Sequence, residues 1–154
     1  MQLSLALTEN LYSVFPLLYR GRHNSMYESS MCWGFECGDG WYQLLYDLSQ
    51  ELSNYLTEHS ALDFEVVQVK SKFGVLHFHL NYRDAETEKM IELARQRASV
   101  TCELTGKPGQ LCVGSTPNPV VVLCAEKVAE LGFSAMRNDA TKSLAPSSPP
   151  TDTG

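Results

Sequence analysis

The densest group of chemically distinctive residues runs from Cys32 to Tyr42, with the sequence Cys-Trp-Gly-Phe-Glu-Cys-Gly-Asp-Gly-Trp-Tyr. It contains both tryptophans of the chain, and its two acids, Glu36 and Asp39, are interleaved with aromatic residues. Two carboxylates beside apolar rings can do acid–base work if burial raises the pKa of one of them. The stretch holds no histidine or serine, and the chain has no nucleophile elbow, phosphate-binding loop or dinucleotide fingerprint. An enzyme is therefore the weaker interpretation.

His77 and His79 form a second candidate, two residues apart in a segment that alternates apolar and polar positions. In a strand both rings lie on one face, where a third ligand from Asp63 or Glu65 would complete a metal site. The alternative is that both rings face solvent on the open side of an antiparallel sheet. The sequence favours this alternative.

Three cysteines, Cys102, Cys112 and Cys124, surround a turn rich in glycine and proline and outline a zinc ribbon. Structural zinc takes four ligands, usually as two close pairs. Neither pair is complete, because Thr105 and Lys127 stand three residues after the first and last of these cysteines. The alternative is three reduced thiols that fill a small core. We expect no cofactor, with zinc at the three cysteines left open.

The segment Lys70-Ser71-Lys72-Phe73-Gly74 places two lysines and an aromatic ring at the tip of a predicted hairpin. Such a tip can contact phosphate or an acidic protein surface. The alternative is a solvated turn without a function of its own.

Three helices are predicted to position these groups. Apolar residues three and four apart predict helices over 3–19, with Pro16 bending or ending it, and over 41–56. Asp84 is expected to cap a third over 85–99, whose apolar side is Met90, Ile91, Leu93, Ala94 and Ala98.

The turn before the second helix has its own chemistry. Gly38 and Gly40 give the backbone freedom to turn, and the carboxylate of Asp39 is expected to accept from the free amides of the first helical turn. Most of the stretch is thereby given a structural role. Four residues are left as candidates for contact with a partner: Trp33, Phe35, Glu36 and Tyr42.

Segments 62–69 and 75–82 predict two strands joined by residues 70–74 into a hairpin. Residues 120–123 predict another strand, and 125–131 a closing helix ended by Gly132. The sequence predicts an α+β fold, in which a small antiparallel hairpin or sheet packs against two or three helices and a ribbon-like C-terminal subdomain follows. The expected boundaries are 1–100, 101–133 and a disordered tail over 138–154.

Composition limits the possible partners. The chain has 154 residues, a net charge of −6 and an odd number of cysteines, five. This charge argues against a general nucleic-acid binder, and the cysteine count argues against a closed disulfide framework. No run approaches the roughly 20 apolar residues of a membrane span, and no signal peptide is visible. We expect a protein of the reducing cytoplasm without a membrane partner.

Several of these motifs follow one another along the chain in a distinctive order. They are Gly34 to Tyr42, then Val67-Gln68-Val69-Lys70 through Phe73-Gly74, then Thr101-Cys102-Glu103 and Leu123-Cys124-Ala125-Glu126. The order resembles a family of small phage and prophage proteins with an ECGDGW turn, a VKxKFG hairpin and a ribbon-like segment. The resemblance covers about residues 31–132. It implies a phage origin and a bacterial host cytoplasm, and transfers no activity. This chain departs from the family at Thr105 and Lys127, where the family carries a cysteine and a histidine.

The leading hypothesis is a phage-encoded, non-enzymatic accessory protein that binds a host or phage protein complex, for example to inhibit a bacterial defence system. Aromatic side chains beside charges dominate binding energy at protein interfaces. One alternative is a nucleic-acid-binding ribbon protein, and another is a hydrolase or transferase using Glu36, Asp39, His77 and His79. The predicted binding surface consists of Trp33, Phe35, Glu36, Tyr42, Lys70, Lys72, Phe73, His77 and His79.

Overall fold

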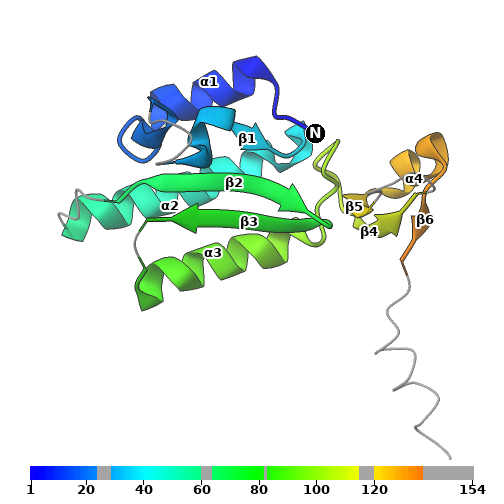
Figure 1. Ribbon diagram of the computed structural model, residues 1–154. Helices are drawn as coiled ribbons and strands as arrows, with labels where there is room; N and C mark the ends of the chain where they lie inside the picture. The colour runs from blue at the N-terminus through cyan, green and yellow to red at the C-terminus, as the bar shows by residue number, and fades with distance from the viewer. Residues whose placement is uncertain (24–28, 60–63, 82, 115–119, 137–154) are drawn as a thin grey trace, which may run out of the picture.

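The computed structural model describes residues 1–23, 29–59, 64–81, 83–114 and 120–136 (Figure 1). The predicted tail over 138–154 lies outside this range. Helices α1 (Leu5–Val14), α2 (Tyr42–His59) and α3 (Ala85–Ala98) accompany a three-stranded sheet in the order β1-β2-β3. A second small sheet and helix α4 (Ala125–Leu131) follow, which confirms the predicted α+β class.

Helix α2 contributes four buried leucines to the core. Its buried side chains repeat at helical spacing, as predicted: Leu44, Leu45, Leu48 and Leu52. They join one cluster with residues of β2 (Val66–Lys72) and β3 (Val75–Leu80), among them Val69, Leu76 and Phe78. Burying such a side chain stabilises the fold by about 1.5–3 kcal/mol. α2 thus packs on the face of the sheet that carries Val69, Leu76 and Phe78.

Strands β2 and β3 form the predicted antiparallel hairpin, but its turn is shorter than predicted. β2 continues through Lys72, and only Phe73 and Gly74 make the turn. Both have positive φ, 54° and 78°, as the two central residues of a tight hairpin turn require. Lys70 and Lys72 therefore project from one face of a strand, because alternate residues of a strand share a face.

The short strand β1 (Phe35–Glu36) pairs in parallel with β2, which the sequence analysis did not predict. Phe35 lies beside Val69 and is fully buried, while Glu36 lies beside Lys70. Three short 3-10 helices frame this edge: η1 (Arg20–His23), η2 (Ser30–Trp33) and η3 (Asp39–Trp41). The Cys32–Tyr42 stretch is thus part of the sheet as well as a turn.

Helix α3 begins with a complete capping box, as predicted for Asp84. The amide of Thr87 donates to Asp84 Oδ1 at 2.8 Å, and the amide of Asp84 donates to Thr87 Oγ1 at 3.2 Å. The predicted apolar side is wrong at Leu93, which is 56% exposed, whereas Ala94 and Ala98 are buried. α3 packs beside α2 and β3.

The C-terminal segment forms a ribbon-like unit beyond the hairpin tip (Figure 1). Strands β4 (Gln110–Val113), β5 (Val120–Leu123) and β6 (Ser134–Ala135) form an antiparallel sheet in the order β5-β4-β6. Gly132 ends α4 with a φ of 74°, as predicted. The buried core of the ribbon-like unit is small and consists of Cys102, Cys112, Leu123 and Cys124.

A close backbone contact joins this unit to the Cys32–Tyr42 stretch. The amide of Gly40 donates to the carbonyl of Glu103 at 2.8 Å, and the indole of Trp41 donates to the carbonyl of Thr101 at 2.9 Å. A Cβ on Gly40 would lie 2.2 Å from the carbonyl oxygen of Cys102. Glycine is therefore required here for the close approach of two backbones, whereas the sequence analysis gave it the role of backbone freedom in a turn.

The predicted capping role of Asp39 is wrong. Its Oδ1 accepts a hydrogen bond from the amide of Ser4 at 2.7 Å, which ties the start of the chain to the turn. The residue before η3, Gly38, provides no side-chain cap, and η3 leads directly into α2.

We expect Gly40→Ala to destabilise the protein by about 1–3 kcal/mol, because a backbone cannot yield as a flexible side chain can. Trp41 provides the specific readout, since its indole N–H is held by Thr101. Hydrogen exchange of that indole proton should accelerate in Gly40→Ala. Gly132→Ala serves as the control, because its φ is strained but nothing lies within 4 Å of the added Cβ. Equal indole exchange in the two variants would contradict this role of Gly40.

Candidate binding site

A pocket of about 430 Å³ lies where the hairpin tip meets the ribbon-like unit. We call it the seam pocket. Its polar lining comes mainly from β1 and β2. Its apolar lining comes from the hairpin turn, from β5, from Met1 and from Phe133, which follows α4. The lining residues are Met1, Glu36, Lys70, Ser71, Lys72, Phe73, Glu103, Val120, Val121 and Phe133. Four of the predicted binding residues, Glu36, Lys70, Lys72 and Phe73, are brought together here.

Glu103 is the unexpected member of this pocket, because its carboxylate is almost completely buried, with 1% exposed. Oε2 accepts from the amide of Gly38 at 3.2 Å, and Oε1 accepts from the hydroxyl of Ser71 at 2.9 Å. Burial raises its pKa even though these two hydrogen bonds favour the charged form. Nothing in the local sequence marks Glu103, because its partners are about 30 and 65 residues away.

The outer face of the sheet adjoins the pocket through Glu36 and Lys70, which belong to both. The pairing register places Glu36, Lys70 and His77 in one row across β1, β2 and β3. His79 lies on the same face as His77, and their ring centroids are 5.8 Å apart. The alternation predicted for β3 is confirmed, with His79 exposed and Phe78 buried.

The metal site considered for His77 and His79 gains no ligand from the structure. Of the two acids considered as a third ligand, Glu65 pairs with Arg20 at 3.3 Å, and Asp63 lies outside the described residues. Across those residues, no group of three or more His, Cys, Asp or Glu side chains is arranged to hold a metal ion. Solvent exposure remains the better interpretation of the histidine face.

Five of the predicted binding residues do not line the pocket. His77 and His79 are on the adjoining sheet face, and the other three lie elsewhere. Phe35 is buried and stacks edge-on against Tyr19 with centroids 5.1 Å apart, so it is a core residue and cannot offer its ring to a partner. Tyr42 is half-buried, and Asn10 contacts its hydroxyl. Trp33 is 57% exposed and remains available at the end of η2.

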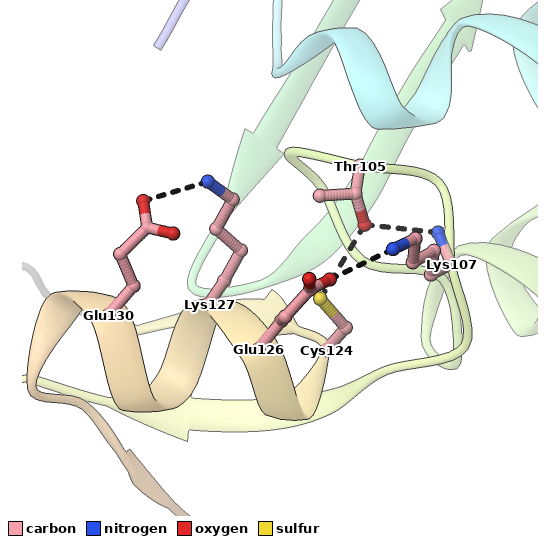
Figure 2. A network of polar contacts seen from close by, with 6 residues as sticks. All are labelled: Thr105, Lys107, Cys124, Glu126, Lys127 and Glu130. Carbon is pink, nitrogen blue, oxygen red and sulfur yellow. Dashed lines mark hydrogen bonds and ion pairs between the residues drawn. The ribbon is translucent and has the colours of Figure 1, made fainter.

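Cys124 of the ribbon-like unit lies in a network of direct polar contacts (Figure 2). The hydroxyl of Thr105 donates to Cys124 Sγ at 3.6 Å, and Lys127 pairs with Glu130 at 2.9 Å. Hydrogen bonds from Thr105 and from nearby amides outweigh burial and lower the pKa of Cys102. The residues present do not make a four-ligand zinc site, because a hydroxyl and a paired ammonium stand at two of the four positions. Zinc at the three cysteines stays a prediction.

Within the described part of the chain, the structure does not bring the acids and histidines of the proposed hydrolase or transferase site into contact. Asp39 is bonded to Ser4, and Glu36 lines the seam pocket. Among the described residues, no hydrogen bond or ion pair joins these acids to His77 or His79.

Comparisons with known proteins leave the function to be argued from the site. No family model matches the chain, and no match was found among curated proteins or solved structures. In the described part of the chain, no helix has both the length and the apolar character of a membrane span.

We expect the charge of Glu103 to make stability depend on pH. Its folded-state pKa is raised, so its contribution is fully present below the ordinary value of about 4.3 and is lost as pH rises through the folded-state value. In Glu103→Gln the amide can accept from Gly38 and donate to Ser71 without titrating. Urea unfolding from about pH 4 to 8 should therefore show wild type losing stability relative to this variant.

The matched control for Glu103 is Glu103→Ala, which leaves the amide of Gly38 without its partner. It should be less stable than Glu103→Gln by about 1–3 kcal/mol at every pH, since a buried donor is then unsatisfied. A Gln variant that follows the wild-type pH dependence would refute the assignment of the buried charge.

His77 should titrate below the ordinary histidine value of about 6.5. Desolvation lowers its pKa first, followed by the positive charges of His79, Lys72, Arg95 and Lys70. Its contribution to stability is present above the ordinary value and falls as pH drops through it, because the unfolded chain then binds more protons. NMR titration of Lys72→Gln should show the pKa of His77 rising, whereas Lys89→Gln should leave it unchanged.

Proposed function

We propose that this protein is a non-enzymatic binding protein, and that the seam pocket with the adjoining sheet face receives an acidic protein surface. The observation that carries the proposal is the placement of Lys70 and Lys72 at the rim of a pocket with apolar walls. Exposed lysines alone would indicate only a solvated strand. Combined with an exposed aromatic ring and a cavity that is apolar on one side, they suit recognition of another protein.

The chemistry of the pocket defines the partner's side of the contact. Phe73 is 61% exposed at the hairpin tip, and Val120, Val121 and Phe133 line the opposite wall. A partner would insert an apolar side chain between these residues and direct a neighbouring carboxylate toward Lys70. Burial of the apolar side chain supplies affinity, and the charge pair supplies orientation and rate of association.

The resemblance to small phage proteins provides the biological setting for this proposal. The protein would act in the cytoplasm of a bacterial host, on a host or phage protein complex, with a component of a defence system as one specific target. A protein without a catalytic site acts there by occupying a surface that the complex needs. The pocket and the sheet face offer one contiguous surface for this purpose.

Nucleic acid is the second candidate, and the lysines of β2 next to exposed Phe73 are the feature in its favour. Lysines can follow a phosphate backbone while an aromatic ring stacks on bases. The net charge of −6 and the carboxylate of Glu36 within the same face disfavour a polyanion such as nucleic acid, whereas a protein partner needs to bring only one carboxylate to Lys70. The two candidates differ in their sensitivity to nuclease.

Affinity capture from bacterial lysate, with the captured proteins quantified by mass spectrometry, tests this proposal. The double variant Lys70→Glu/Lys72→Glu and the single variant Phe73→Ala should each reduce the capture of the same protein by at least about tenfold. Lys107→Glu/Lys127→Glu makes the same change in net charge on the ribbon-like unit and should capture it like wild type.

Capture that is equal for the pocket variants and the control would exclude the seam pocket as the binding site. Loss of capture after nuclease treatment would favour the nucleic-acid alternative. Circular dichroism of each variant establishes that it is folded before capture is compared.

A further inference from the structure

The outer edge of β3 is a second feature of the fold, separate from the seam pocket. β3 is the last strand in the order β1-β2-β3, so no strand of that sheet pairs with its outer edge. After a two-residue turn the hydrogen-bonded pairs alternate, which directs the main chain of Val75 and His77 toward β2. Leu76 and Phe78 then present their main chains outward. The guanidinium Nε of Arg95, 3.3 Å from the carbonyl of Leu76, is consistent with this direction.

A groove of about 600 Å³ lies between this edge and α3, which runs beside β3 (Figure 1). Because the side chain of Phe78 packs in the core, its main chain is the part that faces the groove. Within the described residues, no hydrogen bond to the outward amide or carbonyl of Phe78 is present. Leu80 and Ile91 add an apolar surface from the strand and the helix.

The charges of the groove distinguish among possible occupants. Its two acids are already engaged, since Glu88 pairs with Arg83 at 3.2 Å and Glu92 pairs with Arg95. Lys89 also lines the groove and has no ion pair among the described residues. The groove is therefore net positive. A second copy of this chain, paired edge to edge, would bring two such positive walls together, so a self-associated dimer is disfavoured.

We infer that this groove binds an extended acidic peptide segment of another protein, which adds to β3 as a fourth strand. Main-chain hydrogen bonds to Phe78 would supply affinity, and alternate side chains of the peptide would supply selectivity. Apolar residues of the peptide would contact Leu80 and Ile91, while its acids would reach Lys89 and Arg95. This groove shares no lining residue with the seam pocket, so an experiment can refute one proposal and leave the other standing.

Selection from a displayed library of random peptides of about eight residues, a typical strand length, against the full chain tests this inference. The selected peptides should alternate apolar and acidic residues. Fluorescence anisotropy of a synthetic selected peptide should show binding weakened about tenfold by Lys89→Glu, since one charge-assisted contact is lost. Lys107→Glu, which makes the same change at another exposed lysine, on the ribbon-like unit, should leave binding unchanged.

Two further measurements distinguish strand addition from simple charge attraction. N-methylation of alternate peptide amides on the edge that faces β3 should abolish binding, whereas methylation on the opposite edge should be tolerated. Hydrogen exchange of the Phe78 amide should slow when the peptide is bound. No enrichment, or selected peptides insensitive to both Lys89→Glu and N-methylation, would overturn the inference. A dimer by sedimentation with the Phe78 amide protected in the absence of peptide would replace it with self-pairing.

Discussion

The architecture depends on one contact, in which two backbones approach closely enough that only glycine fits between them. Gly38 and Gly40 lie against Cys102 and Glu103, and the carboxylate of Glu103 completes the contact by accepting from Gly38 and from Ser71. This contact sets the ribbon-like unit against the hairpin tip. The seam pocket exists because the two units are held at this distance, so its walls come from residues that are remote in sequence.

The same contact explains why a buried carboxylate is retained at a junction. An apolar side chain in place of Glu103 would leave the amide of Gly38 buried without an acceptor, which costs about 1–3 kcal/mol. The carboxylate satisfies that amide and a hydroxyl of β2 together, at the cost of its own desolvation. It therefore links three parts of the chain through one side chain: the turn, the hairpin and the ribbon-like unit.

Local patterns in the sequence predicted the helices and strands. Long-range contacts determined the strand pairing of β1 and the hydrogen-bond partner of Asp39, which those patterns did not predict. The stripe of α2, the capping box at Asp84 and the alternation of β3 are each encoded within a few residues, and all three are present. The parallel pairing of β1 was missed because a two-residue strand has no periodicity to detect. Asp39 had the correct residue type for a cap, but the amide of Ser4, 35 positions away, takes its carboxylate.

The candidate site was predicted in the same uneven way. Lys70, Lys72, Phe73 and Glu36 were singled out by type and do line one pocket, whereas Phe35 had an equally distinctive type and is buried in the core. A side chain's type indicates what it can contribute to a contact, but only the register of β1 on β2 decides which of two neighbours faces outward. The role of Glu103 could not be predicted from the sequence, because it depends on how the ribbon-like unit packs against Gly38 and Ser71.

The edge of β3 also bears on solubility. An uncovered edge strand is a template for growth of intermolecular sheets, and proteins commonly protect such edges with charge or a covering element. Here α3 runs alongside β3, and the guanidinium of Arg95 donates a hydrogen bond to the carbonyl of Leu76. A single strand can enter the space that remains, but the edge of another folded sheet would meet the helix. The protein can thus keep one edge open in a crowded cell without promoting its own aggregation.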